Sequence, residues 1–281
     1  MLVYSVCRKL FILSIEYYYR NFGRTIFFCM KRKKPNSNKI FFITIGLIVI
    51  FLIVRYIGMQ IPPTRIHDEP NGIEVDKSRY PITGIDISRH TGVVDFRKIK
   101  EQFNDTIDFV YIKTSEGANL VDVKFETNYN NAILNGIPVG AYHFFKFNVS
   151  GKRQATNFLQ VINNKLFNLP LVLDVEEWSN PGEYNQKKVI KEIRSFILEV
   201  EIRRNEKVMI YTNESSYQTY IHGNFESNKI WICSFSPQPK NLKTWTFWQH
   251  SHNGKLEGAE GWVDINTFNG TRKDWDQFLK L

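Results

Sequence analysis

Short runs of β-branched and aromatic residues recur along the chain from residue 82 onward. Runs of this kind, separated by polar and turn-forming residues, are typical of β-strands. Eight are present: GIDIS (84–88), FVYIKTS (109–115), VGAYHFF (139–145), LPLVLDVE (169–176), KVMIYTN (207–213), KIWICSF (229–235), TWTFWQHS (244–251) and VDINTF (263–268). The pattern therefore predicts eight strands.

Between the first five strands lie segments whose apolar residues recur at helical spacing. The clearest covers residues 186–205, and weaker ones cover 95–103, 124–135 and 152–163. After Tyr211 only residues 216–222 leave room for a short helix. Alternating strands and helices predict right-handed crossovers and a parallel sheet. We therefore expect an α/β fold, a TIM-like barrel of eight strands with its helices reduced in the last third.

The N-terminal part has a different pattern. Residues 40–54 are apolar except for Thr44, and extending the run to residue 59 gives about the twenty residues needed to cross a bilayer. Residues 1–39 carry nine basic side chains against Glu16 alone, which is +8 of the net charge of +9. The positive-inside rule then predicts a transmembrane signal-anchor at 40–59, a cytoplasmic N-terminus and an exported remainder, periplasmic or extracellular. No small-x-small cleavage site follows, which favours an uncleaved anchor.

The rest of the chain divides into a linker and one domain. Residues 60–81 contain four prolines and several charges and are expected to be a linker, and residues 82–281 are expected to form the barrel domain. A chain starting at Met30 would have a short basic region followed directly by the apolar one, as export signals do. Our hypothesis is that translation starts at Met30 and that residues 1–29 are not translated. Residues 40–281 together have a net charge of only +1, so the exported part has no basic bias, which argues against nucleic-acid binding. Cys233, its single cysteine, excludes an internal disulfide or a cysteine metal cluster there.

Carboxylates stand at the ends of several predicted strands. Asp86 closes GIDIS, Asp174 and Glu176 close LPLVLDVE, and Asp264 opens VDINTF. A barrel of this type carries its active site at the carboxyl ends of its strands, so we expect these four side chains to converge on one mouth. Strand alternation directs Asp174 and Glu176 inward and leaves Glu177 on the opposite face as a solvated residue.

Two inward carboxylates, about 7 Å apart along one strand, repel each other, which raises one pKa and keeps the other group ionised. A protonated acid beside a charged carboxylate is what glycoside hydrolysis requires. Two structural alternatives remain open: an ion pair with Lys113 or Lys146, or a calcium site built on the four carboxylates.

Seven motifs occur together in a characteristic order: GIDIS, FVYIKTSEG, GIPVGAYHFF, LPLVLDVE, VMIYTN, WTFWQHS and VDINTFNG. In this order and spacing, the chain resembles glycoside hydrolase family 25, the Chalaropsis-type lysozymes, over residues 82–280. The resemblance implies a barrel of five β/α units plus three strands. It also implies a β-1,4-N-acetylmuramidase that cuts peptidoglycan glycan strands between N-acetylmuramic acid and N-acetylglucosamine. No metal or cofactor is required by such an enzyme.

The resemblance also implies roles for individual residues. By motif, Glu176 corresponds to the general acid and Asp174 to its ionised partner, while Asp86 and Asp264 correspond to flanking carboxylates. The sugar's acetamido oxygen or a water would attack the anomeric carbon, and substrate assistance is favoured because both carboxylates stand on one strand. The expected membrane contact is through the N-terminal anchor alone.

The expected sugar cleft is lined by Tyr142, Tyr211 and Gln249, again by motif. Trp178 is one of several aromatic residues near the mouth that are expected either to stack on sugars or to pack in the barrel. The family usually has Tyr after the Gln of the WQ motif, whereas His250 follows here, and WICSF replaces a motif that more often ends in Ala-x-Tyr. We expect His250 and His252 to be surface or sugar-stacking residues, and His143 to be a core or supporting residue.

Two other functions are alternatives to a muramidase. Chitinase-like barrels end a strand in Asp-x-x-Asp-x-Asp-x-Glu, which would need aspartates where this chain has Leu169 and Val172. A catalytically inactive peptidoglycan-binding module on the same fold is the other alternative. The presence of all four carboxylates favours the enzyme.

Overall fold

The structure, a computed structural model, describes residues 73, 75–102, 107–178, 180–236, 238–239, 242 and 244–279. The predicted basic segment 1–39, the predicted membrane segment 40–59 and most of the predicted linker 60–81 lie outside these residues. Within the part of the chain that is described, no helix is both long and apolar enough to cross a membrane. The assignments made for the N-terminal segments therefore stay predictions.

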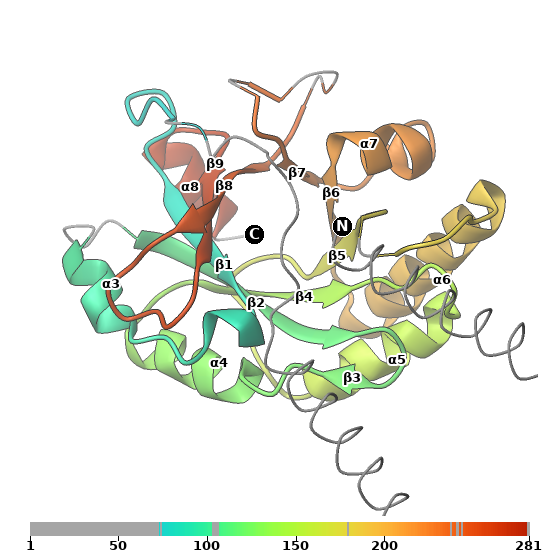
Figure 1. Cartoon of the computed structure of the whole chain (residues 1–281), viewed down its shortest axis with the longest axis horizontal. Helices are drawn as coiled ribbons and strands as arrows, with labels where there is room; N and C mark the ends of the chain where they lie inside the picture. Colours follow the sequence, from blue (N-terminus) through green and yellow to red (C-terminus); the bar gives the residue numbers. More distant parts are fainter. Residues whose placement is uncertain are drawn as a thin grey trace, which may run out of the picture. The chain divides into compact units, whose positions relative to one another are not determined.

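Eight strands close into a barrel, which confirms the predicted fold (Figure 1). Each predicted strand is present: β1 Thr83–Ile87, β2 Ile107–Glu116, β4 Val139–Phe144, β5 Val172–Val175, β6 Met209–Asn213, β7 Ile230–Cys233, β8 Phe247–Gly254 and β9 Val263–Phe268. They pair in that order, and β1 pairs with both β2 and β9, so the ring is complete. An additional short strand, β3 (Leu120–Val121), folds back on the end of β2.

The last strand reverses the direction of the sheet. The neighbouring barrel strands from β1 to β8, β3 apart, all pair in parallel, whereas β9 is antiparallel to both β8 and β1. Only eight residues separate β8 from β9, too few for the crossover that a parallel connection needs. The start of β9 therefore lies at the end of the barrel where the other strands finish.

Helices cover the outside of the first part of the barrel, as predicted. They are α3 Phe96–Gln102, α4 Phe125–Leu134, α5 Gly151–Val161 and α6 Gln186–Arg204. Figure 1 shows these four following one another around the outer side of the strands. The short segment expected at 216–222 consists of α7 (Glu214–Ser216) and a single turn, η2 (Tyr217–Ile221). Another turn, η1 (Arg89–Thr91), follows β1.

A C-terminal helix, α8 (Arg272–Phe278), is absent from the sequence prediction. Its start carries a capping box, in which Thr271 and Asp274 satisfy each other's backbone N–H groups. Trp275 of this helix is buried and packs on Phe109, Phe247 and Phe268. Because these rings lie inside the barrel, α8 closes the end away from the carboxyl ends of the strands.

Two apolar cores lie on the two faces of the strands. The outer core packs the strands against the helices and includes Leu171, Leu173 and Val175. The inner core fills the barrel and is mostly aromatic: Ile82, Phe109, Tyr111, Leu169, Val172, Met209, Tyr211, Trp231, Phe247, Phe268 and Trp275. The predicted alternation of β5 is thus confirmed, because Val172 faces inward while its neighbours face the helices.

The aromatic filling leaves no room for side chains at two glycines. A Cβ atom at Gly84 would lie 2.4 Å from the ring of Phe109, and one at Gly140 would lie 2.1 Å from the ring of Tyr111. The missing side chain of Gly84 thus makes room for the ring of Phe109, and that of Gly140 for the ring of Tyr111, inside the barrel. The rings could not occupy the barrel axis if both positions carried side chains.

We predict that Gly140→Ala lowers the free energy of unfolding by about 3 kcal/mol, because the added methyl group overpacks the barrel against Tyr111. Urea unfolding measures the change. The double variant Tyr111→Leu/Gly140→Ala should be more stable than the sum of the two single changes predicts, since the clash is with that ring. Additive losses would contradict this explanation.

Ile73 and residues 75–80 cover the outer face of β8 and β9, where helices are missing. The backbone N–H of Ile73 donates to the carbonyl of His250 at 3.0 Å, and Nδ1 of His250 lies 2.9 Å from the carbonyl of Ile73. Tyr80 packs on Trp245 and Trp248 in the same region. A hollow of about 630 Å³ lies between this segment and the strands. His250 therefore faces outward and holds the incoming chain, and it is not a sugar-stacking residue.

Because two histidines are buried, we predict that the free energy of unfolding depends on pH. Burial lowers the pKa of His250 from 6.5 to about 4, and that of the fully buried His143 to about 3. The unfolded chain binds protons that the folded chain excludes, so this contribution is complete above pH 6.5 and is lost as the pH falls toward 4.

We expect His250→Gln, which keeps a donor for the Ile73 carbonyl, to reduce that loss by about 2 kcal/mol between pH 7 and pH 4. Chemical unfolding at a series of pH values measures the effect. His222→Gln changes an exposed histidine and should leave the curve unchanged. If the free energies of unfolding of wild type and His250→Gln change with pH in parallel, His250 does not cause the loss of stability at low pH.

Candidate functional site

Four carboxylates meet at the open end of the barrel, which we call the mouth. Asp86 lies near the end of β1, Asp174 near the end of β5, and Glu176 directly after β5. Asp264 lies at the start of the reversed strand β9 and is paired in register with Asp86. Burial, followed by the charges of Asp86, Asp174 and Asp264, raises the pKa of Tyr142, which lies among them. The structure therefore brings the predicted carboxylates together.

Asp174 and Glu176 form a buried pair on the inner face of β5. Oδ1 of Asp174 is buried and has no hydrogen-bond partner, whereas Glu176 accepts a 2.5 Å hydrogen bond from the indole N–H of Trp178. Burial raises the pKa of Asp174 well above its usual range, and the charge of Glu176 raises it further. The neutral form is thus favoured at Asp174, and a hydrogen-bond donor favours the charged form at Glu176.

Which of the two carboxyl groups donates the proton stays a prediction. The expected proton donor was Glu176 and the expected ion was Asp174. Alternation along β5 predicts that the two side chains share a face, but it does not say which is more deeply desolvated. Both side chains are 5% exposed, and the partners of Asp174 on the neighbouring strands are Phe144 and Tyr211.

Lys113 and Lys146 form ion pairs with Glu116. The ammonium nitrogen of Lys113 lies 2.8 Å from a Glu116 oxygen, and that of Lys146 lies 3.3 Å from the other. Burial alone would raise the pKa of Glu116, but the two ammonium groups lower it below its usual value. The ion pair with Lys113 or Lys146 that the sequence left open for Asp174 is thus formed by Glu116. Among the described residues, no group of three His, Cys, Asp or Glu side chains is arranged to hold a metal ion.

A chain of hydrogen bonds fixes Asp86 from two sides. The hydroxyl of Tyr211 donates to Oε1 of Gln249, and Nε2 of Gln249 donates to Oδ2 of Asp86, both at 2.8 Å. From the other side, the indole N–H of Trp231 donates to Oδ1 of Asn266, and Nδ2 of Asn266 donates to the same Asp86 oxygen, again at 2.8 Å. Five strands contribute one residue each, so the orientation of this carboxylate depends on closure of the barrel.

The predicted sugar-contacting residues fall into two groups. Trp178 is 60% exposed and Tyr142 is partly exposed, so both can be reached from the mouth. Tyr211 and Gln249 are buried and serve the hydrogen-bond chain to Asp86. Asn266 of this chain of bonds was not predicted from the sequence, although it stands two residues after Asp264 and so shares its strand face.

Two further polar residues are explained by their surroundings. His143 is fully buried, with Nδ1 2.8 Å from the Ser115 hydroxyl and its ring stacked on Phe196, which confirms a core position. Cys233 lies in the mouth beside Tyr211, and burial, then the charge of Glu176, raises the pKa of its thiol. Glu177, expected to be solvated, is partly buried and accepts a hydrogen bond from the hydroxyl of Ser215.

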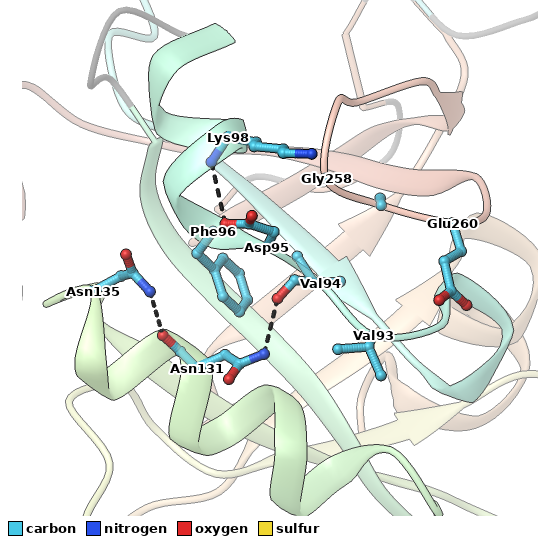
Figure 2. A pocket seen from close by; sticks show the side chains of 10 residues that line it. Val93, Val94, Asp95, Phe96, Lys98, Asn131, Asn135, Gly258 and Glu260 are labelled. Atoms are coloured by element: carbon cyan, nitrogen blue, oxygen red, sulfur yellow. Dashed lines mark hydrogen bonds between the residues drawn. The ribbon is translucent and has the colours of Figure 1, made fainter.

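A separate hollow of about 560 Å³ lies outside the mouth (Figure 2). It is lined by the start of α3, the end of α4 and residues 258–260 of the β8–β9 loop. Asn131 spans it by donating to the carbonyl of Val94, and Asn135 in turn donates to the carbonyl of Asn131. None of the four mouth carboxylates lines this hollow.

The chain is similar to known proteins in sequence and in fold. Residues 85–259 match the family model described as Glycosyl hydrolases family 25. The chain is 36% identical to YegX of Escherichia coli O6:H1 over 204 residues, which is 71% of this chain and 74% of that protein. It is 33% identical to Lysozyme M1 of Streptomyces globisporus over 208 residues, 68% of each chain.

A solved structure shows the same architecture. The family 25 glycosyl hydrolase of Bacillus anthracis matches with a TM-score of 0.66 and 32% identity, and the match covers 76% of this chain and 99% of that one. The family model spans more than half of the chain and includes three of the four mouth carboxylates. The chain therefore belongs to glycosyl hydrolase family 25 and is a glycoside hydrolase.

Proposed function

We propose that this glycoside hydrolase is a lysozyme that cuts the β-1,4 bond between N-acetylmuramic acid and N-acetylglucosamine in peptidoglycan. Its similarity to Lysozyme M1 of Streptomyces globisporus supports this substrate. The observation that carries the chemistry is the buried pair of Asp174 and Glu176, in which one unpartnered carboxyl oxygen faces a second acid. Such a pair holds one proton between two carboxyls at neutral pH.

The proton shared by the pair is the one that the reaction uses. A sugar acetamido N–H that donates to Oδ1 of Asp174 would stabilise the charged form of that carboxyl. The proton then passes to Glu176, which gives it to the glycosidic oxygen as the bond to the anomeric carbon breaks. Asp86, held by two amide donors, adds negative charge at the mouth that stabilises the developing oxocarbenium ion.

The acetamido oxygen of the same sugar attacks the anomeric carbon and forms a cyclic intermediate. Glu176, now a carboxylate, takes a proton from the water that opens this ring, so the configuration is retained. Asp174 and Glu176 stand on one strand and reach the sugar from one side. An internal nucleophile supplies the attack from the other side, which a second protein carboxylate would otherwise have to provide.

A chitinase-like assignment is not favoured by the barrel interior. The position where that signature needs an aspartate next to the pair is Val172, which is fully buried in the inner core beside Met209 and Trp231. A charged side chain there would be desolvated without a partner. An inactive binding module would have no need of a buried carboxyl pair.

We further propose that the catalytic domain acts outside the cytoplasm, tethered by the predicted anchor at residues 40–59. The support is the sequence: a basic segment followed by an apolar run of bilayer length. A wall polymer as substrate is consistent with this location. Protease digestion of intact cells that removes the barrel domain and leaves the N-terminal segment would test the orientation.

Glu176→Gln should lower kcat on purified peptidoglycan by about 10³-fold, because the amide cannot donate the proton. The folded structure should persist, since glutamine can accept the same N–H of Trp178. Release of muramic acid reducing ends by the full-length chain measures the reaction.

Glu177→Gln is the matched control, one residue away and on the opposite face. We expect this variant to keep kcat within about twofold of wild type. Activity near wild type in Glu176→Gln would assign the acid to another group, and glucosamine reducing ends would identify a different bond.

Asn266→Leu should lower kcat by about 30-fold with little change in KM, because Asp86 loses one donor and Trp231 loses its acceptor. Asn269→Leu removes a different amide, which donates to the Trp245 carbonyl outside the mouth. That control is expected to keep kcat near wild type. If both variants lose activity in proportion to thermal stability, the role of Asn266 is structural only.

A further inference from the structure

Two large aromatic side chains are exposed beyond the mouth carboxylates. Trp178 is 60% exposed and Trp262 is 53% exposed, although tryptophan is usually well buried. Trp178 follows Glu176 by two residues, and Trp262 precedes Asp264 by two residues. β9 runs antiparallel to β5, so both steps lead outward from the barrel. The indole N–H of Trp178 donates to Glu176, and Trp262 lies in the loop directly before β9.

The two tryptophans stand on opposite sides of the mouth. In the closed ring of eight strands, β5 and β9 are four steps apart in either direction. Eight strands about 4.8 Å apart, tilted as in such barrels, give a ring about 15 Å across. A ligand that touches both rings must therefore extend over several sugar units, with the four carboxylates beneath its centre.

The loop that carries Trp262 is fixed to the turn after β1. The N–H of Gly261 donates to the carbonyl of Thr91 at 3.1 Å, and a Cβ atom at Gly261 would lie 2.4 Å from the carbonyl oxygen of His90. The N–H of Asp95 donates to the carbonyl of Gly258 at 2.8 Å. These backbone contacts hold the exposed ring in place before any ligand binds, which lowers the entropy cost of binding.

A lysine side chain lies close to the Trp262 ring. The ammonium nitrogen of Lys255 lies 4.5 Å from the centroid of the Trp262 ring. The loop also carries Glu257 and Glu260, and Glu260 lines the separate hollow shown in Figure 2. An indole with an adjacent ammonium group matches a sugar that presents C–H groups on one face and a carboxylate on its edge.

We propose that Trp262 and Lys255 form a second sugar-binding platform, which binds an N-acetylmuramic acid unit of the glycan strand away from the bond that is cut. This inference rests on the proposed function, because it takes the carboxylate of muramic acid as the partner of Lys255. The four carboxylates of the mouth repel an anionic strand, so a cation at the rim offsets part of that repulsion. The platform makes long peptidoglycan strands better ligands than short ones.

Binding is measured on the full-length chain with Glu176→Gln, so that turnover does not consume the ligand. The probes are soluble peptidoglycan glycan strands and N-acetylglucosamine oligomers of the same length, which lack the lactyl carboxylate. Added Trp262→Ala should raise the Kd about tenfold for both probes, since it removes the stacking surface. Added Trp262→Phe should restore most of the affinity.

Lys255→Met, in the same background, should raise the Kd about threefold for glycan strands only, and the difference should fall at high salt. Leu166→Ala is the control, because Leu166 is also an exposed apolar residue and lies in the loop after α5, on the amino-terminal side of the strands. Equal affinity of Trp262→Ala and this control for glycan strands would overturn the platform. An equal effect of Lys255→Met on both probes would overturn the assignment to muramic acid.

Hydrolysis by the wild type is a separate readout. Absence of any released reducing ends from peptidoglycan would refute the proposed function, while the titrations would still decide whether Trp262 binds the glycan. Normal hydrolysis with unchanged binding by Trp262→Ala would refute the platform and leave the proposed function in place.

Discussion

The aromatic filling of the barrel is the constraint on which the remaining structure depends. Rings from several strands, among them Phe109, Tyr111, Trp231 and Phe247, occupy the axis, and α8 closes the far end with Trp275. Water and polar groups are excluded from that volume, so charged side chains on the inner face can exist only at the open end. The rings thus form a floor for the mouth, and that floor desolvates whichever carboxylate lies nearest to it.

Desolvation is also what gives the mouth its chemistry. Burial raises the pKa of Asp174 and the charge of Glu176 raises it further, while Glu176 itself receives an indole N–H. Two chemically similar acids, both 5% exposed, therefore differ in their hydrogen-bond partners. Asp86 reaches a defined orientation by another route, through amide donors on β8 and β9. The lysines nearby are paired with Glu116 and moderate the charge without neutralising the pair.

In the last third of the barrel, where the outer helices are few, another segment covers the strands. β8 and β9 have no helices comparable to α3–α6, and Ile73 and residues 75–80 cover part of their outer face instead. The contact between Ile73 and His250 places the beginning of the domain on the same strand that supplies Gln249 to the mouth. The reversal at β9 has a second effect, because it brings the β8–β9 loop, with Trp262, to the rim opposite β5.

Local patterns in the sequence were sufficient for much of this description. Alternation and helical spacing act between near neighbours, so they predicted the strands, four outer helices, the thinning of helices after Tyr211, and the inward pair on β5. The family motifs placed the four carboxylates in one mouth. The capping box of α8, also local, was present and could have been recognised from Thr271 and Asp274.

Other features depend on which strands become neighbours and in what register, and these are set by contacts between distant residues. The unpartnered Oδ1 of Asp174, the amide donors of Asp86 and the outward direction of His250 all arise this way. So does the position of Trp262 across from Trp178, which follows from ring closure and the reversed strand. The sequence by itself determined which residue types stand at the strand ends, since that is a property of spacing. Only the tertiary structure decided which hydrogen-bond partners each acid has, since those partners depend on the space between strands.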